Sequence, residues 1–306
     1  MNDNDIKNIR EIKKFLDDND IEYTTKLDNF CLFYDDPDKR NYEIEYVSSL
    51  DYPIAYPKYG IEGVSKNYFY EKSVYAENNN SFKMWIKDFE WHDDKKRDVL
   101  KSYILHACGK TPNKYYARDC EVRVVPPKEA RLFEFENCFY GKRGASLSLG
   151  LYSKKDKNGI RANKLLMLYT FGKNFFGRGN DIEIIRVGTL KFTHIVGGSS
   201  KLLKYFINNY KTMKIGKTEV EVERIRFYSD YDHNLGNSMS LLGFEFVGYT
   251  GGGFVNFWVE TGEIKNRQPN KHKWVMEQMA QSKCFAIPNA GVKTYVLNLE
   301  NKEKRK

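Results

Sequence analysis

Paired cysteines are missing from this sequence. The five cysteines are odd in number and widely spaced, and no two form a Cys-x-x-Cys pair: Cys31, Cys108, Cys120, Cys138 and Cys284. This argues against both a disulfide framework and a zinc finger, because each needs cysteines at close, regular spacing. We expect reduced thiols in a cytosolic protein.

The sequence also lacks a long apolar run. Residues 1–20 place five apolar side chains on one helical face between charges, unlike the continuous apolar core of a signal peptide: Ile6, Ile9, Ile12, Phe15 and Leu16. No later window reaches the length of a membrane span, and there is no Walker motif, repeat or low-complexity block apart from the charged end NKEKRK. We expect a soluble protein that stays in the compartment where it is made.

What the sequence does contain is ample material for packed cores. Hydrophobic residues make up 41% of the 306, including 22 Tyr and 20 Phe, which excludes wholesale disorder. The length is about twice that of a usual domain, so two domains are expected. The 50 Lys and Arg exceed the 41 Asp and Glu, and the net charge of +9 favours a polyanion such as nucleic acid.

Three regions can be told apart along the chain. Residues 1–112 contain the amphipathic helix, short strands, a strand over SFKMWIKDFEW and a helix over DDKKRDVLKSYILHACG. Residues 113–265 alternate strands and helices, with FVNFWVE predicted as the partner strand of the end of NSMSLLGFEFVGY. Residues 266–306 add a helix and strand extension with a basic tail.

A glycine-rich turn, HIVGGS at 194–199, joins a strand to an amphipathic helix in the second region. With SLLGFEFVG further on, this order resembles the GNAT acyltransferase fold, whose turn binds the pyrophosphate of coenzyme A through amides at a helix N-terminus. The resemblance implies Gly197, Gly198 and Ser199 as coenzyme-binding residues, although His194 stands where that family has Arg or Gln. Alternatively, the glycines only allow a tight crossover. We favour this alternative and expect no cofactor.

A longer resemblance is carried by residues 66–122. The motifs DFEWHDD, DVLKSYIL and YYARDC follow one another as in the C-terminal half of the Vsr-like (EDxHD) nuclease domain of phage homing endonucleases. Those phage proteins commonly have a GNAT-like C-terminal half with an Ala-Gly near the end, similar to IPNAGVKTYVLNL here. The resemblance implies an α/β (α+β) chain of phage origin. Its degenerate Vsr-like, PD-(D/E)XK nuclease-like N-terminal domain would precede a GNAT-like mixed-sheet domain.

A nuclease of this class needs two or three carboxylates on adjacent strands for Mg²⁺ and a Lys or His for the attacking water. The resemblance implies Asp28 and Glu45 as metal ligands and Lys72 as the catalytic base; further carboxylates are Glu43, Asp51 and Glu71. The chain departs from the family, because Phe69 occupies the histidine position in NYFYEKS. Phenylalanine neither ligates a metal nor moves a proton. We therefore favour ordinary surface charges on a relic scaffold.

Two other segments carry polar or aromatic clusters. YSDYDHN places Asp230, Asp232 and His233 together, which suits an ion but equally a turn. The loop from Gly172 to Gly179 is the best candidate for recognition of nucleic acid or protein, with four side chains between glycines: Lys173, Phe175, Phe176 and Arg178. Its alternative is a hairpin whose phenylalanines enter the core.

From the lost chemistry we infer a non-catalytic phage protein that binds a macromolecule, with a host antiviral defence complex as the expected partner. Length and phage character also suit the phage anti-Gabija inhibitors. The alternatives are a site-specific, Mg²⁺-dependent homing endonuclease acting on DNA and a GNAT-type acyltransferase. We expect the host cell cytoplasm and no membrane association, and the many aromatic residues are compatible with a homo-oligomer.

Overall fold

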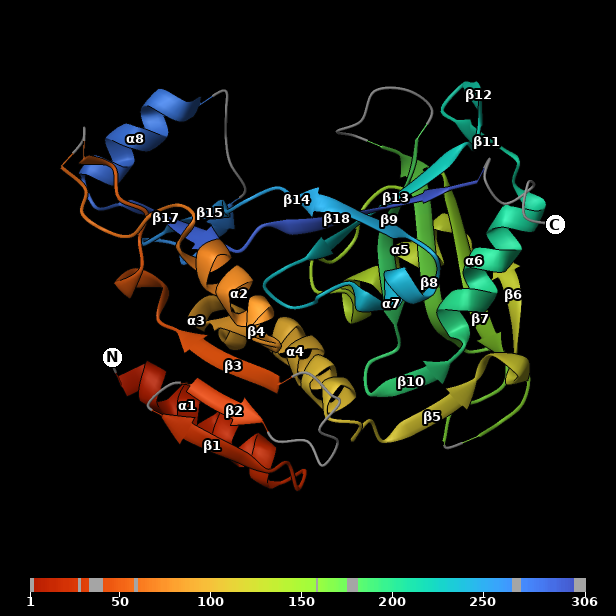
Figure 1. Ribbon diagram of the computed structural model, residues 1–306, viewed down its shortest axis with the longest axis horizontal. Helices are drawn as coiled ribbons and strands as arrows, with labels where there is room; N and C mark the ends of the chain where they lie inside the picture. Colours follow the sequence, from red (N-terminus) through yellow and green to blue (C-terminus); the bar gives the residue numbers. More distant parts are fainter. Residues whose placement is uncertain are drawn as a thin grey trace. The chain divides into compact units, whose positions relative to one another are not determined.

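The computed structural model describes residues 3–26, 29–32, 41–57, 60–157, 159–174, 181–265 and 271–299. It has mixed α/β structure, with helices and several multi-stranded sheets, as the sequence predicted (Figure 1). The helices are α1 (Asp3–Asp17), α2 (Tyr68–Asn78), α3 (Asp88–His92), α4 (Asp94–Ala107), α5 (Pro127–Asn137), α6 (Gly198–Asn209), α7 (Asn237–Leu241) and α8 (His272–Ala280). The first strands are β1 (Tyr23–Lys26), β2 (Asn29–Leu32), β3 (Asn41–Val47), β4 (Ser81–Lys87), β5 (Asn113–Tyr116), β6 (Cys120–Val124), β7 (Leu147–Ser153), β8 (Leu165–Lys173) and β9 (Ile182–Thr189). The later strands are β10 (Thr193–Val196), β11 (Thr212–Ile215), β12 (Thr218–Glu221), β13 (Arg224–Asp230), β14 (Glu245–Tyr249), β15 (Gly253–Trp258), β16 (Ile264–Lys265), β17 (Cys284–Asn289) and β18 (Val292–Asn298).

The chain divides into two compact units, and each is assembled from three separate segments. Unit 1 comprises Met1–Arg97, Ser229–Leu235 and Tyr249–Lys293. Unit 2 comprises Asp98–Tyr228, Gly236–Gly248 and Thr294–Lys306. The units are therefore discontinuous in sequence, whereas the predicted regions were contiguous with boundaries at 112/113 and 265/266.

The main sheet of unit 1 has the order β1-β2-β3-β4. Strands β1, β2 and β3 form an antiparallel meander, and β4 runs parallel to β3. A parallel neighbour requires a crossover, which α2 supplies. This helix buries Phe69 and Ser73, and Ser73 accepts a 2.8 Å hydrogen bond from the indole of Trp85 on β4. Segment 68–78 is thus a helix where short strands were predicted.

Helix α1 forms where predicted but buries a different face. Ile12 and Leu16 are buried as expected, whereas Ile6 is 39% exposed and Asp5 and Asn8 are buried instead. The reason is Tyr46 on β3, whose hydroxyl donates to Asp5 and accepts from the Asn8 amide, both at 2.8 Å. A buried tyrosine hydroxyl needs polar partners, so the helix turns polar residues inward.

A second sheet of unit 1 has the order β16-β15-β17, with α8 packed against it. The predicted pairing of FVNFWVE with the end of NSMSLLGFEFVGY is wrong, because β15 pairs with β16 and β17 while β14 lies beside β18. The Ala-Gly of this region has a clear structural cause. Gly291 has φ +80°, and a Cβ there would lie 1.9 Å from the carbonyl oxygen of Gly251. Only glycine fits so close to a backbone.

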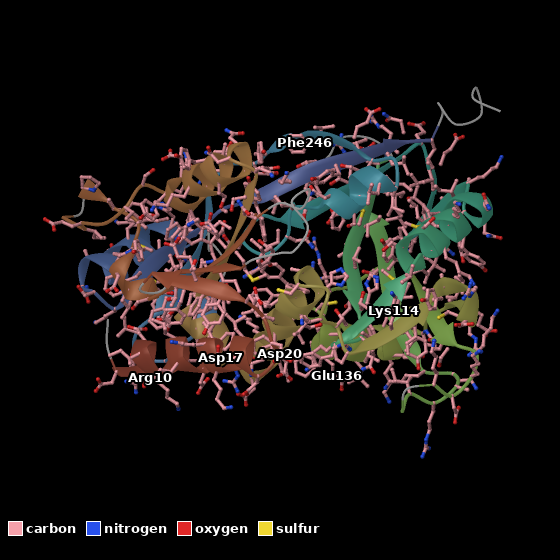
Figure 2. All side chains as sticks on the ribbon, turned by 60° about the horizontal axis from the view of Figure 1, so that its bottom comes forward. Arg10, Asp17, Asp20, Lys114, Glu136 and Phe246 are labelled. Atoms are coloured by element: carbon pink, nitrogen blue, oxygen red, sulfur yellow. The ribbon has the colours of Figure 1, made fainter. Side chains whose placement is uncertain are left out.

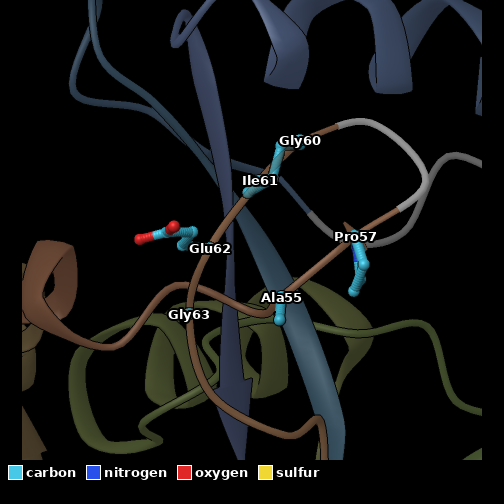
Figure 3. Close-up of a pocket in the computed structure, with 6 residues that line it drawn as sticks. All are labelled: Ala55, Pro57, Gly60, Ile61, Glu62 and Gly63. Atoms are coloured by element: carbon cyan, nitrogen blue, oxygen red, sulfur yellow. The ribbon is translucent and has the colours of Figure 1, made fainter.

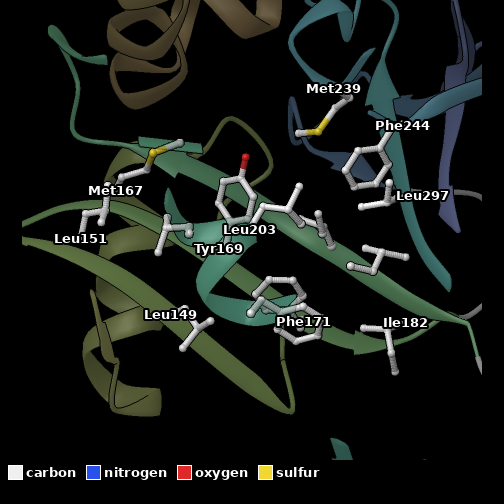
Figure 4. Packing of buried hydrophobic residues seen from close by; sticks show 14 of the residues in the cluster. Leu149, Leu151, Met167, Tyr169, Phe171, Ile182, Leu203, Met239, Phe244 and Leu297 are labelled. Atoms are coloured by element: carbon white, nitrogen blue, oxygen red, sulfur yellow. The ribbon is translucent and has the colours of Figure 1, made fainter. Parts of the chain in front are cut away.

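Unit 2 is built on a seven-stranded sheet of order β14-β18-β13-β9-β8-β7-β6. The pairs from β6 to β9 are antiparallel, while β9 and β13 are parallel. Helix α6 covers one face through Leu202, Leu203 and Phe206, which pack on Leu149, Leu151, Tyr169 and Phe171 (Figure 4). The other face carries α5, whose Ala130 and Phe133 pack on Tyr152 and Leu168. Successive side chains of β7 and β8 thus point to opposite faces of the sheet, and both faces are buried.

Two short strands of unit 2 form a separate parallel pair. Strand β10, the predicted strand before the glycine turn, pairs in parallel with β5, and His194 lies opposite Lys114. The sequence did not predict this pairing, because the partner strand β5 lies about 80 residues earlier in the chain.

Across the residues that the structure describes, no helix has the length and apolar character needed to cross a lipid bilayer.

Candidate functional site

The most polar constellation on the main sheet of unit 1 joins Glu43, Glu45 and Lys83. The two glutamates alternate on β3 and therefore share a face, and Lys83 stands opposite Glu43 on the parallel neighbour β4. The Lys83 ammonium lies 3.0 Å from a Glu43 oxygen and 2.7 Å from a Glu45 oxygen. Ser81 donates a further 2.8 Å hydrogen bond to Glu43.

This constellation is half-buried and holds one positive charge between two negative ones. The exposed fractions of the three side chains are only 13% for Lys83, 24% for Glu43 and 17% for Glu45. Burial disfavours the charged ammonium, but hydrogen bonds and attraction from Glu45 and Glu43 outweigh it and raise the pKa of Lys83. Lysine therefore stays charged between the carboxylates.

The residues predicted for a nuclease do not come together as a group. Glu45 contacts Lys83, not Lys72, whose ammonium lies 4.8 Å from the ring centre of Tyr68 on the exposed side of α2. Asp28 lies outside the described residues. Phe69 is fully buried, with its ring centre 4.4 Å from that of Trp85, so this residue belongs to the core.

A resident Mg²⁺, which the nuclease resemblance would imply, does not fit the described donors. The two carboxylates face the same ammonium, which occupies the place of a cation between them. Within residues 3–299, leaving out the segments not described, no group of three His, Cys, Asp or Glu side chains could hold a metal ion. No catalytic step through a metal is therefore derived.

A second charge network, buried except for Asp230, lies at the end of β4. Lys87 contacts Asp232 at 2.6 Å and Glu90 at 3.7 Å. His233 lies 2.5 Å from Asp230 and 3.5 Å from Glu90. The backbone amide of Ala290 donates to the other oxygen of Asp232 at 2.7 Å. Glu90 of α3 thus joins the cluster predicted from YSDYDHN, although it lies 143 positions earlier in the chain than His233.

The opposite charges in this network stabilise one another's charged forms. Burial opposes charge on His233, but Asp230 and Glu90 outweigh it and raise the pKa of the imidazole to about 10. Burial likewise opposes charge on Glu90, but Lys87 and His233 lower the pKa of its carboxyl to about 2. Lys87, Glu90, Asp232 and His233 are buried and paired with one another, so these charges stabilise the fold.

A third polar cluster joins α2 to the last strands of unit 1. The ammonium of Lys293 lies 2.7 Å from one oxygen of Glu77, whose other oxygen accepts from the hydroxyls of Tyr231 and Tyr249. Lys293 also lies over both tyrosine rings, at 5.4 and 5.5 Å from their centres. These contacts explain a lysine that is only 3% exposed.

The glycine turn predicted for coenzyme A is explained by backbone and packing. Gly197 caps α6 with φ +75°, and a Cβ at Gly198 would lie 2.8 Å from the sulfur of Met167. Ser199 is half-buried in the first turn of α6. His194 stacks on His106 with ring centres 4.8 Å apart, and burial together with Lys114 lowers the pKa of His194. The left-handed backbone at Gly197 and the close packing at Gly198 therefore account for both glycines without a bound ligand.

The predicted recognition loop is described only at its start. Lys173 is the last residue of β8 and is exposed. Phe175, Phe176 and Arg178 lie outside the described residues.

A different surface presents apolar side chains together with cations. Helix α5 and the residues after it expose Leu132 (57%), Phe135 (45%) and Tyr140 (56%). The Lys142 ammonium lies 5.9 Å from the ring centre of Phe135, and the Arg186 guanidinium lies 5.9 Å from that of Tyr140. We call these five residues, with Lys128, Arg131 and Arg143, the α5 surface. In the sequence, Leu132 and Phe135 are apolar residues that fall outside the inward stripe of Ala130, Phe133 and Asn137.

Unit 1 also has a shallow pocket of about 410 Å³, lined by Ala55, Pro57, Gly60, Ile61, Glu62 and Gly63 (Figure 3). Its lining contains none of the predicted site residues and one carboxylate, so it defines no chemistry.

A scan against models of known protein families finds no match, and a search of curated proteins finds no matching sequence.

Proposed function

We propose that this chain is a non-catalytic binding protein that works on a protein partner through the α5 surface. The observation that carries the proposal is the exposure of three large apolar side chains among basic ones: Leu132, Phe135 and Tyr140. Aromatic residues and arginine dominate the energetics of protein interfaces, and contiguous apolar surface on a folded unit marks such sites.

The flanking charges indicate the chemistry of the partner. Lys128, Arg131, Lys142 and Arg143 are exposed beside the apolar residues, with Glu136 as an exposed acidic neighbour. A complementary partner has an apolar centre with an acidic rim, since opposite potentials across an interface speed association and exclude wrong partners.

The internal use of the nuclease-type residues supports a role without catalysis. Glu45 is engaged by Lys83, and Phe69 belongs to the core. From the resemblance to phage homing endonucleases, we propose that the partner is a host antiviral defence complex met in the host cytoplasm. An inhibitor of that kind needs a rigid surface and no reaction.

The strand order of each unit supports the proposed descent from phage homing endonucleases. In unit 1, a helix is followed by an antiparallel meander, a crossover helix and a parallel strand, an order that supports the proposed nuclease-like descent. In unit 2, the parallel strands β9 and β13 lie side by side, with the glycine turn and α6 between them in the chain. This is the order that a GNAT-like sheet requires.

The test is affinity capture of the tagged chain from host cells that carry nuclease-based defence systems, with bound protein and bound DNA quantified side by side. We expect a stoichiometric protein complex that re-forms from purified components. Leu132→Glu with Phe135→Glu should weaken it at least tenfold, because hot-spot residues contribute about 2 kcal/mol or more.

Leu241→Glu is the matched control, since this leucine is 89% exposed on α7 and its replacement adds the same kind of charge elsewhere. Equal weakening by both variants would reject the α5 surface. Failure to capture any protein in fixed stoichiometry would reject the inhibitor proposal itself.

The competing hypotheses make different predictions. A homing endonuclease would cleave DNA with Mg²⁺ and lose this activity on Glu45→Ala or Asp28→Ala; lack of cleavage with any divalent ion sinks it. An acyltransferase would bind coenzyme A, and calorimetry that shows no heat at about millimolar ligand counts against it.

A further inference from the structure

A basic surface of unit 2, distinct from the α5 surface, forms where two segments lie side by side. Residues 113–119 contain β5 and a short 3-10 helix, and the described residues 154–157 and 159–164 follow β7. The backbone amide of Lys154 donates to the carbonyl of Asp119 at 3.0 Å, and the Lys154 ammonium donates to the carbonyl of Arg118 at 3.2 Å. The Tyr115 hydroxyl donates to the carbonyl of Lys157. These bonds hold both segments as one surface.

The charge on this surface is strongly one-sided. Seven basic residues stand against two acidic ones, Asp119 and Asp156, in the two segments: Lys114, Arg118, Lys154, Lys155, Lys157, Arg161 and Lys164. Asp119 is matched by Lys155 and Lys157, each 3.9 Å away, and Asp156 accepts a hydrogen bond from the amide of Ala162. Five exposed cations therefore remain beyond these pairs: Lys114, Arg118, Lys154, Arg161 and Lys164.

The aromatic ring of Tyr116 lies at the centre of these cations. The charged groups of Arg118, Lys157 and Lys114 are 4.9, 5.5 and 5.9 Å from its centre. Lys114 is two residues before Tyr116 on the same strand, β5; Figure 2 labels Lys114 there. Tyr116 itself is half-buried, so the ring is held in place while one portion of it faces solvent. Lysine and arginine have flexible stems, and their charged ends can leave the ring for a nearby phosphate.

We propose that this surface, called the Tyr116 surface, binds single-stranded nucleic acid. Cations that follow a backbone and an aromatic ring that stacks with a base are the two elements of single-strand recognition. A duplex keeps its bases stacked inside, so it could use the cations but not the ring. The proposal goes beyond the protein partner of the α5 surface and does not depend on it.

The experiment is fluorescence anisotropy of a labelled oligo-deoxythymidine of about 16 nucleotides, titrated with the intact chain at several salt concentrations. The same titration with a duplex of equal length gives the comparison. We expect tighter binding of the single strand and a linear fall of log affinity with log salt.

Lys114→Glu with Arg118→Glu should weaken single-strand binding and reduce the salt slope by about 1.4, corresponding to two lost phosphate contacts. Lys214→Glu with Lys217→Glu on the β11–β12 hairpin is the matched control, because both lysines are exposed and the change in net charge is the same. Tyr116→Leu should lower affinity about tenfold and leave the slope unchanged, while Tyr116→Phe retains stacking and affinity.

The proposal is overturned if the hairpin control weakens binding as much as the Tyr116-surface variant, which would show a nonspecific charge effect. It is also overturned if the duplex binds as tightly as the single strand, or if only an acidic protein is captured and no oligonucleotide binds. Loss of the α5 partner complex with oligonucleotide binding retained would separate this proposal from the proposed function.

Discussion

The charge state of His233 is determined by the charged side chains around it. It is enclosed with Asp230 and Glu90, and Lys87 and Asp232 complete the network. Taking so many charges out of water is costly, and the cost is offset only when each charge has its partner. Removal of one member leaves the others buried without compensation.

We predict that the stability of the chain falls as pH rises from about 6.5 to about 10. The folded-state pKa of His233 is raised from 6.5 to about 10, so its contribution is complete below 6.5 and is lost as pH passes through 10. Urea unfolding followed by the emission of buried Trp85 and Trp91 measures this across the range.

The comparison is His233→Gln, which should cost about 3–5 kcal/mol near neutral pH and flatten the decline. His106→Gln is the matched control, because burial lowers the pKa of His106 and removes it from this range. A wild-type stability that stays constant up to pH 10 would contradict the assignment.

At the scale of elements, strands β3 and β4 show what alternation can predict. Glu43 and Glu45 share a face in NYEIEYV, and Ser81 and Lys83 share a face in SFKMWIK. Both patterns can be read from sequence, but the parallel register that brings Lys83 to both glutamates cannot. The sequence therefore predicts Lys72, the nearest base along the chain, as the catalytic base, and does not predict Lys83 as the partner of the glutamates.

We predict that Lys83→Met destabilises the chain by about 1–3 kcal/mol, since it leaves two half-buried carboxylates facing each other. The triple variant Glu43→Gln, Glu45→Gln, Lys83→Met should recover some of this loss, because no charge is then left unpaired. Urea midpoints measure both, with Lys72→Met as a control of the same chemistry at an exposed position. Equal effects of the two lysine variants would show that the ion pairs contribute nothing.

At the scale of the whole molecule, unit 1 depends on segments that are distant in sequence. Lys87 and its partner Asp232 are separated by 145 positions, and Lys293 and Glu77 by 216. The backbone amide of Trp85 also donates to the carbonyl of Asp232. The contiguous segment of residues 1–112 therefore lacks one of the counter-charges of its own buried lysine.

We predict that a fragment of residues 1–112 does not fold cooperatively by itself. It would leave Lys87 with Glu90 as its remaining partner and would expose the surface around Trp85 that Tyr231 and Ala290 cover. Near-ultraviolet circular dichroism and tryptophan emission should resemble those of an unfolded chain. The intact chain with Asp232→Ala should be weakened in the same direction. A cooperative unfolding transition in the fragment would reject this prediction.

Much of the local structure could be predicted. The helices at 3–17 and 94–107 and the strands β7, β8, β9 and β13 all follow from nearby residues. The inward face of α1 could not, because Tyr46 on a later strand decides it. The same holds for β14 and β15, neighbours in the chain that join different sheets.

The sequence by itself determined the α/β class and most helices and strands, because hydrogen bonding and amphipathic spacing are local properties. Tertiary structure alone decided which lysine meets which carboxylate, which charges are buried, and where Tyr116 meets the cations of the segment after β7. These pairings join residues that are far apart in the chain, and their energy depends on burial and distance in space rather than on spacing in sequence.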